Sequence, residues 1–239
     1  MKLTKIVLWL VVLGVVAVGA FVFWFAVIRD DDPLEAKLPE TSSTVAPSTE
    51  PGATTTSGAP SDAGVEGVWT LQPGDGEELF VGYNIEETLR GLDATATGTT
   101  GTYEGALTIE GASVTALGVT IDMTTLESDE GFRDDSIRDE GIESDTFRTA
   151  TFTLAAPIEL PGEPVPGEEI AVPATGDLTL HGVTKAVSFE VKGRFNGDSI
   201  DVTGTIPVVL ADYGITAPSR GFVSVRGEGE IVFVLRFAR

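Results

Sequence analysis

The chain has 239 residues, no cysteine and a formal net charge of −22. The lack of cysteine excludes disulfide bonds, a thiolate nucleophile, cysteine-ligated metals and a lipid anchor attached through cysteine. The strong negative charge repels nucleic-acid phosphates and anionic lipid headgroups, which argues against both as direct partners of the folded part.

Residues 6–28 form an uninterrupted apolar run. A helix of this length, at ~1.5 Å per residue, spans about 34 Å and can cross a hydrocarbon core of ~30 Å. Lys2 and Lys5 precede the run and three aspartates follow Arg29, so the positive-inside rule places the N-terminus in the cytoplasm and the remainder outside. We predict an uncleaved membrane anchor at residues 1–29. The alternative is a cleaved secretory signal, whose apolar region is normally about 7–15 residues long.

Residues 30–64 are rich in Pro, Ser, Thr, Gly and Ala. A segment with so few apolar side chains cannot offset the entropy lost on ordering its backbone. This composition predicts a disordered stalk between the membrane and a folded domain at residues 65–239.

The domain contains short segments in which apolar and polar residues alternate, separated by turn residues. This period-2 pattern places every second side chain on one face of a β-strand. The segments are 68–71, 79–85, 102–110, 113–124, 148–154, 168–174, 198–208 and 221–237. About eight to ten short strands with little helix indicate an antiparallel sandwich or barrel.

Residues 176–192 show this pattern most clearly. Two alternating arms flank a glycine-containing loop at 181–185, which is typical of a β-hairpin. Residues 128–141 break the alternation and favour a short helix or a structured loop, and residues 212–214 favour a tight turn or one helical turn.

The hairpin sequence GDLTLHGVTK, followed by an alternating strand, resembles the signature of the YceI-like family of lipid- or polyisoprenoid-binding domains. Further segments resemble the family in the same order, at 119–126, 132–138 and 149–152 and at the motif pair 204–206 and 212–215. The chain departs from the family pattern at two places. Residues 74–78 lack the His-Ser pair that the family often carries in its first long strand, and Arg148 stands where the family commonly has a proline. The resemblance implies an extended, lipocalin-like antiparallel barrel whose lumen holds a long isoprenoid or similar amphiphile.

Catalysis and metal binding have little support in the sequence. His181 is the only histidine and lies in a predicted turn, where a hydrogen-bonding role is the usual one. The chain has no nucleophile elbow, zinc-protease motif or phosphate-binding loop, and the acidic stretch at 122–145 does not have the spacing of a calcium loop. We therefore predict a non-enzymatic protein without a metal or cofactor.

The inward-facing rows combine small residues with aromatic ones, so they form either an elongated apolar tunnel or an ordinary interdigitated core. The candidate lumen residues are Phe152, Leu154, Leu178, Leu180, Phe189, Val191, Phe233 and Leu235. Arg133 and Arg138 are candidates for contact with a polar headgroup, and the alternative is that both pair with neighbouring aspartates.

We expect an extracytoplasmic binding protein, tethered to the cell membrane by a single span. In its lumen it would hold a polyisoprenoid, an isoprenoid quinone or a similar lipid for transport, storage or protection. The bound lipid would be a ligand rather than a cofactor. The alternative is a structural or interaction domain of the cell envelope, with a filled core and an unidentified protein partner.

Overall fold

The computed structural model of the protein describes residues 32–40, 64–221 and 223–239. The predicted membrane anchor and residues 41–63 of the predicted stalk lie outside these ranges. Within the described ranges, no helix combines the length and the apolar character needed to cross a bilayer.

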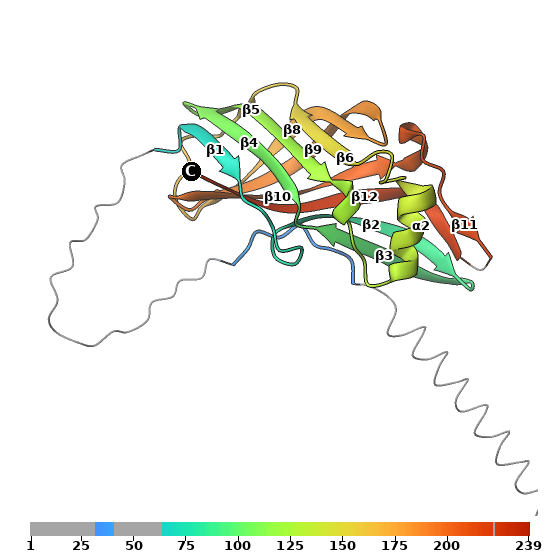
Figure 1. The fold of residues 1–239 in the computed structure, drawn as a ribbon. Coiled ribbons are helices and arrows are strands. Elements are labelled where there is room, and N and C mark those ends of the chain that lie inside the picture. The colour runs from blue at the N-terminus through green and yellow to red at the C-terminus, as the bar shows by residue number, and fades with distance from the viewer. Residues whose placement is uncertain (1–31, 41–63, 222) are drawn as a thin grey trace, which may run out of the picture.

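Eight antiparallel strands of the described region close into a barrel (Figure 1). Around the barrel they are β1 (Gly67–Leu71), β4 (Tyr103–Glu110), β5 (Ser113–Asp122), β6 (Thr149–Leu154), β8 (Glu169–Leu180), β9 (Val183–Phe195), β10 (Ser199–Val209) and β12 (Val223–Ala238). The ring closes where β1 pairs with β12 and Leu71 lies opposite Phe237. The antiparallel barrel of about eight strands that the family resemblance implied, with its short helical insertion, is therefore confirmed.

The hairpin of β2 (Phe80–Leu89) and β3 (Leu92–Thr100) extends the barrel wall at one end. β2 pairs with residues 223–234 of β12, and β3 pairs with the other edge of β2. The C-terminal end of β12 pairs with β1. The turn between them consists of Arg90 and Gly91, both with positive φ, as a two-residue hairpin turn requires. β3 was not expected, because its threonine-rich sequence lacks a clear apolar row. The short strands β7 (Ile158–Glu159) and β11 (Ser219–Arg220) pair with β5 and β12.

The β8–β9 hairpin is longer and tighter than the sequence suggested. His181 and Gly182 alone form the turn, with φ values of 51° and 72°. Residues 183–185, expected in the loop, begin β9 instead, and β8 runs without interruption from the predicted 168–174 segment into the first arm of the hairpin. The positive φ at both turn positions matches the right-handed twist of the paired strands.

Short helical segments cover the end of the barrel where β2 and β3 project. α2 (Gly131–Ser136) and the π-helical turn η2 (Ile137–Gly141) occupy the segment predicted to be a short helix or a structured loop. In Figure 1, α2 stands beside the β2–β3 hairpin. η1 (Met123–Thr125) starts this connection and is capped by Asp122, while η3 (Leu210–Tyr213) forms the predicted helical turn before β11.

Residues 32–40 lie extended on the outer wall of the barrel. Leu34 and Ala36 pack against an outward-facing apolar patch of Phe80, Val232 and Val234. The side chain of Asn84 accepts from the Leu34 amide at 2.8 Å and donates to the Leu34 carbonyl at 3.0 Å. For these nine residues the structure differs from the expected disordered stalk, because β12 is apolar on both faces and its outer face needs a cover.

The far end of this segment meets a buried charge cluster. Asp201, with 1% of its side chain exposed, accepts from Arg236 at 2.6 and 3.2 Å and from Arg194 at 3.3 Å. Arg194 also donates to the carbonyl of Pro39. The hydrogen bond to the Asp201 carboxylate raises the pKa of the Arg236 guanidinium above its ordinary value.

A hollow apolar lumen as the candidate site

The barrel interior is hollow. It contains a cavity of about 300 Å³. The cavity is lined at one end by Val65, Leu160 and Pro164 and at the other by Ile142 and Leu210. It therefore extends along the strands and is enclosed almost entirely by apolar side chains.

The length of the cavity can be estimated from the spacing of its lining residues along one strand. Ile200 and Val208 of β10 both line the cavity and lie eight residues apart. At ~3.3 Å per residue, this spacing corresponds to about 26 Å along the strand. The cavity is thus long and narrow, a shape that suits an extended chain better than a compact molecule.

Most of the predicted lumen residues line this cavity. Those that do are Phe152, Leu178, Leu180, Phe189, Val191, Phe233 and Leu235. Leu154 does not: it is the last residue of β6 and pairs with Gly176, and the ring of Phe152 lies directly over Gly176. Contact between any of these residues and a ligand stays a prediction.

Three phenylalanine rings form a row across the middle of the lumen. Phe152 and Phe189 have ring centroids 5.5 Å apart, and Phe189 and Phe233 have centroids 5.9 Å apart, both with edge-to-face geometry. Gly176 and Gly204 make room for this row, since a Cβ there would approach the rings of Phe152 and Phe233 to 2.3 and 2.8 Å. The rings therefore lie close against the wall, and Phe189 remains partly accessible from inside.

One ion pair lies at the end of the lumen that α2 covers. Glu87 of β2 and Arg133 of α2 both line the cavity, and a carboxylate oxygen of Glu87 lies 3.7 Å from a guanidinium nitrogen of Arg133. Arg133 also donates to Asp129 at 2.7 Å. Arg138 does not line the cavity and pairs with Asp135 at 3.6 Å, with 41% of its side chain exposed. The structure therefore places one of the two predicted headgroup residues at the lumen.

Glu87 lies in the lumen but is not among the residues predicted from the sequence pattern. The predicted strand ended at residue 85, but the alternation of Val81, Tyr83 and Ile85 continues to Glu87 when the strand is extended by two residues. The signal was present and was obscured because a carboxylate is an unusual member of an inward-facing row.

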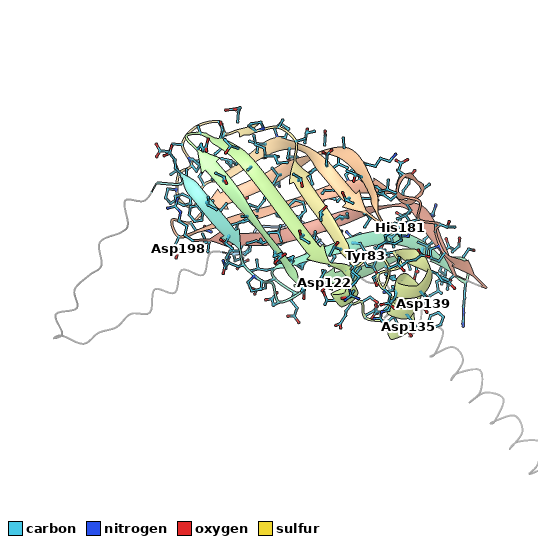
Figure 2. All side chains as sticks on the ribbon, turned by 45° about the horizontal axis from the view of Figure 1, so that its top comes forward. Tyr83, Asp122, Asp135, Asp139, His181 and Asp198 are labelled. Atoms are coloured by element: carbon cyan, nitrogen blue, oxygen red, sulfur yellow. The ribbon has the colours of Figure 1, made fainter. Side chains whose placement is uncertain are left out.

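His181 lies at the same end of the barrel and connects three segments of the chain. Its two ring nitrogens lie 3.1 Å from the Tyr213 carbonyl and 3.2 Å from the Glu143 carboxylate, and its ring contacts Phe147. In Figure 2, His181 lies at the barrel end that carries Asp135 and Asp139, opposite the end with Asp198. The residue links the β8–β9 turn to η3 and to the segment that follows η2.

Acidic side chains do not assemble into a metal site in the described part of the chain. No group of three or more His, Asp or Glu residues there is arranged to hold an ion. The chemistry that the lumen offers is therefore burial of apolar surface, with one ion pair at one end.

A closed antiparallel barrel with a hollow, apolar centre is the architecture of barrels that enclose a small ligand. The model of the YceI-like domain matches residues 69–237, and the chain belongs to this family.

Two solved structures share the fold. A polyisoprenoid-binding domain from Saccharophagus degradans, described as implicated in plant cell wall breakdown, superposes with a TM-score of 0.55 and 18% identity, covering 71% of this chain and 97% of that one. BcnA from Burkholderia cenocepacia superposes with a TM-score of 0.50 and 18% identity, covering 64% and 95%. Among curated proteins, none matches the sequence.

Proposed function

We propose that this protein binds a long apolar amphiphile, such as a polyisoprenoid or an isoprenoid quinone, inside the barrel for transport, storage or protection. The observation that carries the proposal is the elongated apolar cavity of about 300 Å³. Its size falls at the lower end of the range for ligand pockets, ~300–1,000 Å³. The polyisoprenoid-binding function named for the similar Saccharophagus degradans domain supports the same class of ligand.

The physical basis of binding would be burial of hydrocarbon. An isoprenoid tail has no polar group to recognise, so affinity comes from removing its methyl and methylene groups from water, at ~0.8 kcal/mol per buried CH₂. Selectivity would come from the length and width of the lumen. The alternative of a structural domain with a filled core has less support, because inward-facing residues such as Phe189 and Val191 remain partly accessible from the cavity.

The direct test is to purify the full chain from membranes and analyse it by native mass spectrometry after release from detergent. We expect a reproducible adduct whose mass corresponds to a long-chain apolar lipid, which organic extraction removes and added isoprenoid restores. A chain that carries no adduct and takes up no added isoprenoid would contradict the proposal.

We further propose that the apolar run at residues 6–28 tethers the barrel to the cell membrane, with the barrel outside the cytoplasm. The run is long enough to span a bilayer. Lys2 and Lys5 precede it, whereas Arg29 and three aspartates follow it, which favours a cytoplasmic N-terminus. We expect the full chain to remain in the membrane fraction after an alkaline carbonate wash, and a variant without residues 6–28 to be released. A full chain that the wash extracts would refute the tether.

A further inference from the structure

The lumen presents very few charged groups to a ligand. Four charged residues of the described chain line the cavity: Glu87, Arg133, Arg194 and Glu230. Arg194 and Glu230 have their charged groups on the outer wall, where Arg194 binds Asp201 and Glu230 accepts from Asn84 at 2.7 Å. Glu87 and Arg133 are therefore the charged pair that a headgroup inside the lumen would meet.

The Arg133 guanidinium at this end of the lumen is already paired with carboxylates. The Arg133 guanidinium lies 2.7 Å from a carboxylate oxygen of Asp129 and 3.7 Å from one of Glu87. Only 17% of the Arg133 side chain and 11% of the Glu87 side chain are exposed. One cation thus faces two carboxylates, and the more buried carboxylate is the one that lines the cavity.

The usual means of binding a phosphate group are missing from this end. Phosphate sites in proteins combine several cations, a helix N-terminus or a divalent metal ion. α2 has only six residues and is preceded by Glu130, and Arg138 is paired with Asp135 outside the cavity. No cluster of metal-binding side chains occurs in the ranges that the structure describes.

We propose that the lumen selects amphiphiles with an uncharged polar head, such as an alcohol or a quinone carbonyl, and rejects the corresponding phosphates and diphosphates. A hydroxyl group can donate to the Glu87 carboxylate, and a carbonyl oxygen can accept from Arg133. A phosphate would add negative charge beside Glu87 in a partly desolvated site, where like charges repel more strongly than in water. This selectivity rests on the proposed function and assigns its ligand class.

The test is a competition among geranylgeraniol, its monophosphate and its diphosphate, which share one tail. The delipidated full chain is mixed with all three at equal concentrations, and the bound masses are compared by native mass spectrometry. We expect the alcohol to be bound in preference to the diphosphate by about tenfold or more.

The Glu87→Gln variant removes the lumen carboxylate with little change in shape, and should shift the competition by about tenfold toward the phosphates. The matched control is Asp135→Asn, which also removes one negative charge, but from an α2 side chain that is 71% exposed. This variant should leave the competition unchanged. If Glu87→Gln fails to fold by circular dichroism, Asp129→Asn tests the second carboxylate beside Arg133 in the same way.

The outcomes separate the two proposals. If none of the three probes binds, the proposed lipid-binding function fails. If the diphosphate binds as well as the alcohol or better, the lipid-binding function stands and the selectivity for uncharged heads is overturned. A preference for the alcohol that Glu87→Gln and Asp129→Asn leave unchanged would also overturn the assignment to this ion pair.

Discussion

At the scale of single residues, glycines determine how closely the aromatic rings approach the barrel wall. Gly176 pairs with Leu154 and lies under the ring of Phe152, and a Cβ there would also approach the Thr153 carbonyl to 2.5 Å. Because the carbonyl belongs to the backbone, the neighbour cannot move aside without distorting the strand. The small residue is thus required by a close contact rather than by a turn.

Replacing Gly176 should therefore destabilise the barrel. We expect Gly176→Ala to lower the free energy of unfolding by ~1–3 kcal/mol, as overpacked sites do. Gly118→Ala is the matched control, because a Cβ at this strand glycine has no neighbour within 4 Å. Chemical denaturation of the full chain, followed by far-UV circular dichroism, measures both. Equal stability of the two variants would contradict the close contact.

A second prediction at this scale concerns Asp122, which caps η1. Hydrogen bonds from the Thr124 hydroxyl and amide, at 2.6 and 2.9 Å, lower the pKa of the Asp122 carboxyl below its ordinary value of 3.8. A lowered pKa stabilises the fold at pH values above 3.8, and this contribution disappears as the pH falls through the folded-state pKa.

Asp122→Asn should therefore melt at a lower temperature than the unmodified chain at neutral pH. The difference should shrink as the medium becomes more acidic than pH 3.8. Thermal unfolding monitored by circular dichroism across this pH range shows whether the difference in melting temperature shrinks or grows. A difference that grows on acidification would show that the carboxylate does not stabilise the cap.

At the scale of elements, β12 is the strand on which the molecule depends most. It is 16 residues long, pairs with β10 along most of its length and carries β1 and β2 on its other edge. Its inner face contributes Phe233 and Leu235 to the lumen, while Val232 and Val234 on its outer face are covered by residues 32–40. The continuous apolar run of this strand already indicates burial on both faces.

Docking of residues 32–40 should depend on Asn84. Asn84→Ala removes both hydrogen bonds to the Leu34 backbone and should cost about 1–2 kcal/mol of local stability. Hydrogen–deuterium exchange is expected to become faster at the Leu34 amide and its neighbours, while the β8–β9 hairpin keeps its protection. Unchanged exchange at Leu34 would show that apolar packing alone holds the segment.

At the scale of the whole molecule, the proposed function requires the barrel to be hollow. In a filled core, a larger side chain costs ~1–3 kcal/mol because neighbours must move. In a hollow barrel it occupies free space and blocks the ligand instead. Val191, which lines the cavity and is only partly buried, is a suitable position for distinguishing the two.

Val191→Trp should abolish isoprenoid uptake while the free energy of unfolding stays the same or rises. Lys192→Trp is the control, because the side chain of Lys192 faces outward, where its Nζ lies 3.8 Å from a carboxylate oxygen of Glu169. Native mass spectrometry with added geranylgeraniol reports uptake, and chemical denaturation reports stability. A strongly destabilised Val191→Trp variant would indicate a packed interior and would count against lipid binding.

Much of the fold follows from local patterns in the sequence. The alternation in segments such as 113–124 and 198–208 predicted strands β5 and β10 with nearly correct ends. The break in alternation at 128–141 predicted a short helix or a structured loop, and α2 lies there. β3 was missed because threonines and alanines give no strong period, and Leu154 was assigned to the lumen because periodicity ignores where a strand ends.

Local sequence alone shows which face of most strands is apolar, because side chains alternate strictly along a pleated backbone. It could not decide whether these faces meet at the centre, because that depends on the number, tilt and closure of strands that are distant in the chain. The folded chain shows that the interior is hollow, that Glu87 and Arg133 meet at its end, and that residues 32–40 cover β12. Each of these contacts joins segments that no local pattern relates to one another.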